Sequence, residues 1–390
     1  MHHIFQNCTF SLILLLFACN CSLPEKKKSI DSISIKQETI KVTTANVKDS
    51  LLLSSFAENI SFIKLNEHDI NNSKIRKILF TEKHIIVLWD NSKNLILYSR
   101  KGEIESILSQ LVHSNCLSKI SDIFYDLNNN QLHVLCEDGT IVIINVNNDN
   151  NIFVSDIKYL NTYSANSLLK LPDSDSYGVS LYNSDVDFLI TDKHTQNNLS
   201  SSKNQLEYKV GTKLSRNILL RNPIIYDTHS HFYLKYGNDT IYMIISDSLV
   251  PYLIFDLNEL VNINRRNKGL PLTSESNLLY TVELFFYMGG SFYVKTVVNS
   301  TPYYIFRNKK NQTIVLQATD FYNDVFGTSR FNCIAVDPKS NSFVFSISSL
   351  FLTKFLMDSY IPLNEKYKTT INNLLDHNKE ESIILVLVNY

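Results

Sequence analysis

Glycine is scarce in this sequence: the 390 residues include 9 glycines, and tryptophan occurs once, as Trp89. No long basic block is present and the formal net charge is −1, which argues against nucleic-acid binding through a broad electropositive surface. The sequence contains no G-x-S-x-G, no H-E-x-x-H and no glycine-rich phosphate loop. These absences leave no standard catalytic motif, and we expect no cofactor.

The residues that are plentiful point to β structure. Hydrophobic residues make up 44% of the chain and aromatic residues 11%, which is enough for a large core. Asparagine is abundant and occupies left-handed turn positions more readily than most residues, so it compensates for the missing glycines. The length exceeds that of a usual single domain, but all-β domains are often long single units.

The N-terminus reads as an export signal. Phe10 to Ala18 is an apolar run that is too short to span a bilayer as a helix. Leu16 to Cys19 (LFAC) resembles the bacterial lipobox, although no Lys or Arg precedes the run. We therefore expect a lipoprotein signal peptide at 1–18, a lipidated Cys19, and a polar tether and lead-in at 19–50. A plain secretory signal that is cleaved nearby is the alternative.

The cysteines of the expected mature chain match no zinc-binding spacing. A disulfide between Cys116 and Cys136 is compatible with an oxidising envelope, but sequence does not fix its geometry. Cys136 and Cys333 lie in apolar β-runs, where a buried free thiol is the commoner state. Both interpretations stay open at this point.

Short β-runs separated by turn residues repeat along the chain. The clearest set is Phe232–Leu257, in which Gly237-Asn238-Asp239 and Asp247-Ser248 separate three apolar runs. A second set is a meander of four runs that is the size of one propeller blade. Its runs are Ile75–Phe80, Ile85–Asp90, Leu95–Ser99 and Glu103–Leu108.

Further units of this kind follow, with a spacing of roughly 40–50 residues that is typical of β-propellers. We predict an all-β fold, a six-bladed β-propeller of four-stranded antiparallel blades over 51–390. Within it, Asn197–Asn204 reads as a polar loop and Lys366–Asp376 as a short helix. The last run, Ile383–Val388, is apolar on both faces, so we expect it to close the ring by pairing with a strand at or just before Ile60–Leu65.

Three stretches carry a resemblance to a known family. Asn238–Tyr242 (NDTIY) with Pro251–Leu257 (PYLIFDL), the Ile75–Leu108 meander and Glu381–Leu387 resemble motifs of the six-bladed β-propeller lipoproteins of Bacteroidetes. The resemblance covers most of the chain from about Leu51 to Tyr390. It implies a cell-envelope propeller and little about activity. Ser109–Asn115 departs from the family's Gly-Pro-Gly-Glu-like loop, so no function of that loop is carried over.

Two groups of side chains are candidates for a site. Asp227, His229 and His231 alternate along one run and fall on one face, where two imidazoles and a carboxylate are able to hold a metal. Water-facing histidines at a strand edge explain the same pattern, so we expect no metal there. Asp185 and Asp187 invite comparison with the carboxylate pair of glycosidases, but Asp is also common in turns, and we assign no catalytic residue.

The hypothesis that follows is a lipid-anchored protein of the cell envelope, held at the outer membrane with its periplasmic or surface orientation undetermined. It binds a ligand or partner without catalysis, the candidates being a glycan, a peptide or an envelope protein, and it binds no nucleic acid. The first alternative is a propeller hydrolase or lyase acting on glycans or peptides. The second is a scaffold within an outer-membrane assembly.

Overall fold

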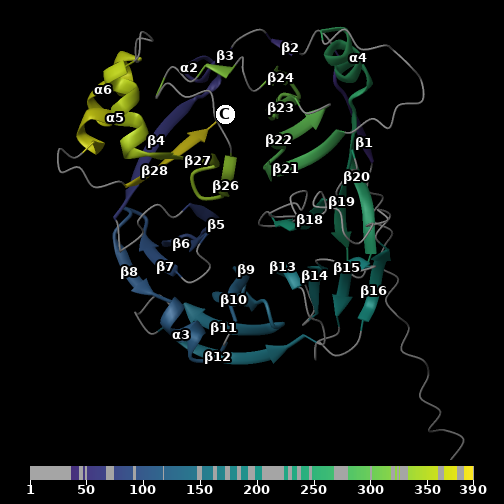
Figure 1. The fold of residues 1–390 in the computed structure, drawn as a ribbon, viewed down its shortest axis with the longest axis vertical. Coiled ribbons are helices and arrows are strands. Elements are labelled where there is room, and N and C mark those ends of the chain that lie inside the picture. Colours follow the sequence, from purple (N-terminus) through teal and green to yellow (C-terminus); the bar gives the residue numbers. More distant parts are fainter. Residues whose placement is uncertain are drawn as a thin grey trace, which may run out of the picture. The chain divides into compact units, whose positions relative to one another are not determined.

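A computed structural model gives the architecture of the chain (Figure 1). It divides the chain into Met1–Gln37 and Glu38–Tyr390, and every helix and strand that it describes lies in the second unit. The residues that it describes are 37–43, 47–48, 51–66, 74–90, 94–116, 118–146, 152–160, 165–171, 176–181, 186–191, 198–203, 224–226, 231–234, 239–245, 248–267, 280–298, 301–317, 321–322, 325, 333–358, 364–375 and 382–389.

The described strands form six sheets of four or five strands and one two-stranded pair, and the six larger sheets are the blades of a propeller (Figure 1). The predicted six-bladed fold is therefore confirmed. Blades 1 to 3 are β5(Ile75–Phe80)–β6(His84–Trp89)–β7(Leu95–Ser99)–β8(Ile104–Ile107), β9(Ile120–Asp126)–β10(Gln131–Cys136)–β11(Thr140–Val146)–β12(Ile152–Tyr159) and β13(Ala165–Lys170)–β14(Tyr177–Leu181)–β15(Val186–Thr191)–β16(Asn198–Lys203). Blades 4 to 6 are β17(Ile224–Tyr226)–β18(His231–Leu234)–β19(Thr240–Ile245)–β20(Ser248–Asp256), β21(Tyr280–Met288)–β22(Ser291–Val298)–β23(Thr301–Arg307)–β24(Thr313–Gln317) and β26(Cys333–Asp337)–β27(Ser342–Ser348)–β28(Ile383–Asn389)–β4(Asn59–Leu65).

The blades close into a ring through their innermost strands. Each of β5, β9, β13, β17, β21 and β26 contacts the innermost strand of the next blade, and β26 contacts β5. Blade 6 is shared between the two ends of the chain, because β28 pairs antiparallel with β4 from Ile383–Leu65 to Asn389–Asn59. The predicted closure of the ring by the final strand on Ile60–Leu65 is confirmed.

The hydrophobic core is divided among the blade interfaces. Alternating side chains on the two faces of each blade pack against the blades on either side. One cluster joins blades 6 and 1 around Trp89 and Tyr98, and another joins blades 5 and 6 around Tyr293 and Phe343. This arrangement explains why strands with two apolar faces are frequent in the sequence.

Two short strands that precede β4 in the chain, β1(Glu38–Lys41) and β2(Val47–Lys48), lie on the outer edges of blades 4 and 5. β1 pairs parallel with β20 as a fifth strand of blade 4, and β2 pairs in the same way with β24 of blade 5. β3(Leu51–Leu52) then pairs with β25(Phe321–Tyr322), and α2(Leu53–Phe56) leads into β4. β1 and β2 fall in the range that we expected to be tether and lead-in.

Helices occur between strands. α3(Ser109–His113) links blades 1 and 2, and α4(Asn258–Asn267) follows blade 4. α6(Glu365–Leu374) confirms the predicted short helix, and Asn364 caps it by accepting a hydrogen bond from the Lys366 N–H. Among the described residues, no helix is long and apolar enough to cross a membrane.

One local prediction is corrected, and one helix was not predicted. The polar loop expected at Asn197–Asn204 contains β16, which pairs antiparallel with β15. An outermost strand is held by its backbone ladder, so its sequence does not need the apolar alternation on which the prediction depended. α5(Ser349–Asp358) was not predicted; it is inserted after β27, and its Leu352 is buried in the core between blades 5 and 6.

The turns confirm the role expected of asparagine. Among the described non-glycine residues, those with positive φ are Asn130, Asn311 and Asn341. Gly102, with a φ of +87°, is less replaceable, because a Cβ there would lie 1.9 Å from the carbonyl oxygen of Lys64. At Gly102, therefore, a side chain is not accommodated.

Candidate functional site

A buried charged group connects the innermost strands of blades 1, 2 and 3. Lys77 of β5 donates to Asp122 Oδ1 of β9 at 2.7 Å, and Ser167 Oγ of β13 donates to Asp122 Oδ2 at 2.9 Å. The Leu168 N–H donates to the same Oδ2 at 2.9 Å. Lys77, Asp122 and Ser167 are successive members of a 45-residue spacing, so they occupy equivalent positions on three blades.

The surroundings of Asp122 decide what it is able to do. Its side chain is 4% exposed and both of its oxygens accept hydrogen bonds from neighbouring blades. A general base needs a free lone pair and access to a substrate proton. Asp122 is buried and already accepts three hydrogen bonds from blades 1 and 3, so this group holds three blades together.

Asp126 and Asp337 are two further buried carboxylates, and each is the last residue of an innermost strand. Asp126 of β9 pairs with Lys170 of β13 at 2.9 Å and also accepts hydrogen bonds from the Asn128 N–H and from Asn129 Nδ2. Burial alone would raise its pKa, but these hydrogen bonds and the charge of Lys170 outweigh burial and lower the pKa below its usual range. The carboxylate is therefore held in its charged form.

Asp337 of β26 has the same role at the junction of blades 6 and 1. It pairs with Arg100 at 2.9 Å and accepts a hydrogen bond from Ser340 Oγ at 2.6 Å. Its side chain is 3% exposed. Asp122, Asp126 and Asp337 are thus all used to join blades.

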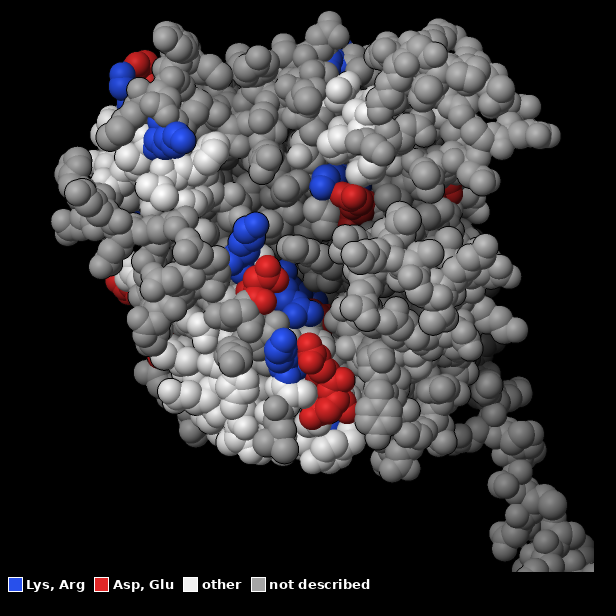
Figure 2. Space-filling model, in the orientation of Figure 1, with Lys and Arg blue, Asp and Glu red and all other residues white. Residues whose placement is uncertain are grey.

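Figure 2 shows the described charged side chains of one face of the protein. Near the middle of that face, basic and acidic groups lie next to one another and do not form a patch of one sign (Figure 2). This mixture agrees with the ion pairs described above. Among the described residues of this face, it gives no support for recognition of a polyanion.

A buried histidine and tyrosine lie between blades 2 and 3. His133 Nδ1 of β10 is 3.0 Å from Tyr177 Oη of β14, and both side chains are buried. Within the described part of the chain, His133 Nε2 has no hydrogen-bond partner. Burial lowers the pKa of His133 to about 3, so the ring is neutral at ordinary pH.

This histidine makes the stability of the fold dependent on pH. The unfolded His133 binds a proton near pH 6.5 and the folded one only near pH 3, so stability falls as the pH drops through this window. We expect a loss of up to about 1.4 kcal/mol per pH unit well inside the window. Urea unfolding at pH 6.5, 5.5 and 4.5 measures it, and His133→Asn, which does not titrate, should have a flatter profile. Equal slopes in the two proteins would contradict the assignment.

The sequence-predicted residues fall mostly outside this network. Cys19, Asp227, His229 and Asp185 lie outside the described residues. His231 begins β18, and its ring centroid is 6.3 Å from that of Phe124. Asp187 lies in β15, and its side chain is not among those described. The prediction that Asp227, His229 and His231 hold no metal stays a prediction.

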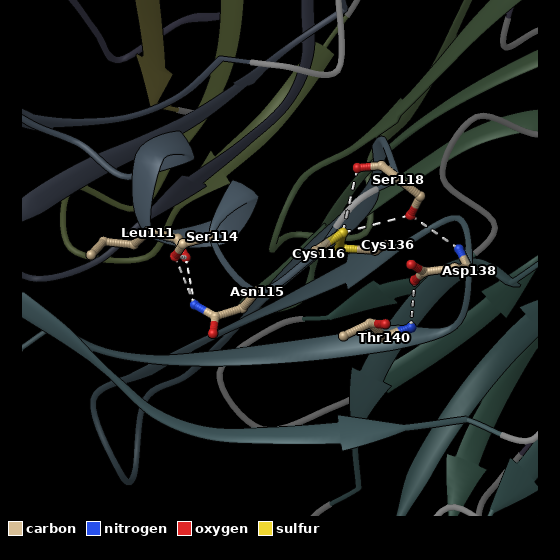
Figure 3. The surroundings of a disulfide bond; sticks show 8 residues. All are labelled: Leu111, Ser114, Asn115, Cys116, Ser118, Cys136, Asp138 and Thr140. Atoms are coloured by element: carbon tan, nitrogen blue, oxygen red, sulfur yellow. Dashed lines mark hydrogen bonds between the residues drawn. A yellow bond between two sulfur atoms is a disulfide. The ribbon is translucent and has the colours of Figure 1, made fainter.

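The cysteines are placed by the structure. Cys116 and Cys136 form a disulfide, one of the two interpretations left open for Cys136 (Figure 3). Cys333 is buried and free. The disulfide connects Cys116, three residues beyond the end of α3, to the last residue of β10, which brings Cys136 a partner that its own apolar run does not reveal. Asp138 lies beside the two sulfurs, but sulfurs that are bonded to each other are not thiolate ligands for a metal.

The fold and this network define the class of the protein: a six-bladed β-propeller whose described buried carboxylates join neighbouring blades. Neither a protein-family model nor a curated sequence matches the chain. Among solved structures, it is similar to a protein of Bacteroides fragilis whose name describes it as exported, with a TM-score of 0.63 and 15% identity over 91% of this chain and 100% of that one.

Two other solved structures are similar to a lesser degree. A Bacteroides caccae protein of unknown function gives a TM-score of 0.40 and 12% identity over 63% of this chain and 82% of that one. The WD40 domain of Neurospora crassa Pan2 gives 0.39 and 10% over 80% and 74%. The six-bladed fold itself is the one that the resemblance of the sequence motifs implies.

Proposed function

We propose that this protein is a lipid-anchored propeller of the cell envelope that binds a ligand or partner and does not catalyse a reaction. The observation that carries the proposal is the state of Asp122, Asp126 and Asp337. Each carboxylate is buried, forms an ion pair with a cation from a neighbouring blade and accepts further hydrogen bonds. Carboxylates in this state stabilise the ring and are not available for proton transfer.

Location in the envelope has two supports. The Cys116–Cys136 disulfide fits an oxidising compartment, because cytosolic thiols are kept reduced. The Bacteroides fragilis neighbour, whose name describes it as exported, shares the fold over its whole length. The resemblance of Leu16–Cys19 to a lipobox supports the lipid anchor in this proposal.

The anchor is tested by Cys19→Ala. Without the cysteine no lipid is attached, and we expect the protein to move from the detergent phase to the aqueous phase in phase partitioning, with its melting temperature unchanged. A protein that carries Cys21→Ala is the matched control and should stay in the detergent phase. If Cys19→Ala still partitions with membranes, the lipobox interpretation is wrong.

Binding is tested with the chain from Ser29 onward, which includes the whole compact unit from Glu38 to Tyr390. This protein is screened against glycans and peptides, and turnover of every binding compound is assayed in parallel. We expect binding without turnover. Turnover that survives further purification would favour the hydrolase or lyase alternative, and stable association with an outer-membrane complex without a small ligand would favour the scaffold.

A further inference from the structure

A hollow of about 220 Å³ lies beside the hairpin that joins β23 to β24 in blade 5. Its apolar lining includes Phe292, Phe306 and Phe343, each less than 10% exposed. Phe292 is the second residue of β22 in blade 5, and Phe343 lies in β27 of blade 6, so the hollow is bounded by two blades.

The polar lining consists mainly of hydrogen-bond donors. Arg307, Lys309 and Lys310 bring positive charge, and Glu58 is the acidic residue among the lining side chains. Arg307 Nη2 pairs with Glu38 Oε1 of β1 at 2.7 Å and donates to Asn311 Oδ1 at 2.8 Å. Arg307 Nε is buried without a hydrogen-bond partner among the described residues. A donor in this state favours an acceptor that arrives with a ligand, because an unpaired buried donor is unfavourable.

The hairpin that carries the two lysines is held in one conformation. Asn308 Oδ1 accepts hydrogen bonds from the Lys310 and Gln312 N–H groups, both at 3.0 Å, and Asn308 Nδ2 donates to Gln312 Oε1 at 2.8 Å. Asn311 takes the left-handed conformation that the turn requires, with a φ of +62°. A rim that is already ordered loses little entropy when a ligand binds.

These groups restrict the chemistry of the ligand. The charge of Arg307 is already paired with Glu38, so Lys309, Lys310 and the unpaired Arg307 Nε are the groups that favour a carboxylate. Glu58 accepts hydrogen bonds from a group that donates, such as a hydroxyl. The phenyl rings call for a compact carbon body, which inorganic anions lack. The volume is below the roughly 300–1,000 Å³ of drug-sized pockets, so the hollow admits one ring-sized unit.

We propose that this hollow binds a uronic acid, a compact hydroxylated carboxylate, either as the free sugar acid or as one residue of an acidic polysaccharide. The proposal rests on the binding function proposed above and names its ligand class. In this proposal the lysines bind the carboxylate of the sugar acid, Glu58 accepts a hydrogen bond from a hydroxyl, and the phenylalanines contact the carbon ring.

The test is calorimetric titration of the full-length protein in detergent with D-galacturonate, with oligogalacturonates and with neutral D-galactose. We expect both acids to bind and galactose to bind roughly tenfold or more weakly, because it lacks the charge. Tighter binding of the oligomers than of the monomer identifies a polysaccharide as the source. Equal binding identifies the free sugar acid.

The site is tested with Lys309→Glu combined with Lys310→Glu. Reversal of both charges should weaken galacturonate binding roughly tenfold or more. Both side chains are exposed, so the fold should be kept, which melting curves verify. The matched control is Lys101→Glu, an exposed lysine on the corresponding hairpin of blade 1, and it should bind like the unchanged protein.

Three results would overturn the proposal. They are no binding of either acid by the folded protein, binding that the double charge reversal leaves intact, and tighter binding of a dipeptide with a free carboxyl end than of galacturonate. If neither acid binds and the wider screen finds another ligand whose binding ignores these variants, the uronate proposal fails and the binding function stands. If no compound binds at all, both fail.

Discussion

Removal of Glu381–Tyr390 should leave a protein that aggregates or is insoluble. β28 lies between β27 and β4, so the deletion exposes the edges of both neighbours. It also removes five apolar side chains that are at most 4% exposed, Ile384 to Val388. At about 1.5–3 kcal/mol each, their burial contributes about 8–15 kcal/mol, which is comparable to the whole stability of a typical domain.

The soluble fraction after expression and the melting temperature measure this effect. A point variant, Val386→Asp, tests it without shortening the chain, because it places a carboxylate at a position that is 0% exposed. Lys368→Ala, which changes an exposed lysine that pairs with Glu365, is the control and should shift stability by less than about 0.5 kcal/mol. A truncated protein that is soluble and melts like the full chain would show that β28 does not hold the ring closed.

Asp122→Ala should cost about 3–5 kcal/mol of unfolding free energy, the second largest effect that we expect. The change leaves the Lys77 ammonium buried without its carboxylate and also removes the acceptor of Ser167 Oγ and of the Leu168 N–H. Because three blades share this carboxylate, its loss weakens two blade junctions at once. Chemical denaturation, with unchanged far-UV circular dichroism of the native state, measures the cost.

A double-mutant cycle separates the ion pair from the rest. Lys77→Met with Asp122→Leu removes both charges and keeps apolar volume, so we expect the double variant to be more stable than Asp122→Ala. The Lys368–Glu365 pair, exposed on α6, is the matched comparison and should show a coupling of about 0.3–0.5 kcal/mol. If Asp122→Ala costs no more than this surface pair, the carboxylate does not join the blades as described.

The sequence predicted the blades whose strands have strong apolar patterns. Each strand end of blade 1 was placed to within one residue, because polar turn residues separate its runs, whereas β20 includes Ser248, which the sequence assigned to a turn. β16 was missed because NLSSSK has no apolar period, and the ladder to β15 that makes it a strand is a contact with another segment. The helix α5, which is inserted in blade 6, was missed for a similar reason, because Leu352 acquires its core neighbours only in the folded ring.

The candidate site was harder to predict than the fold. Lys77, Asp122 and Ser167 are 45 residues apart, and their meeting depends on three blades sharing one register. The repeat spacing was visible, but a Lys, an Asp and a Ser at one position of it form no motif that sequence inspection would select. Of the phenylalanines that line the hollow, Phe306 lies next to the hairpin in sequence, whereas Phe292 comes from β22 and Phe343 from blade 6.

The parallel pairing of β1 and β2 with the outer edges of blades 4 and 5 has a mechanical consequence. A pull on the chain at Glu38, directed along β1, loads the hydrogen bonds between Glu38–Lys41 and Leu253–Asp256 in shear, so they resist together and do not open one by one. The pair of Glu38 with Arg307 at 2.7 Å and that of Lys41 with Glu259 at 3.8 Å resist the same displacement. Tension transmitted from the N-terminal side is then borne first by this edge strand and by β2, before it reaches the closure of the ring at β4.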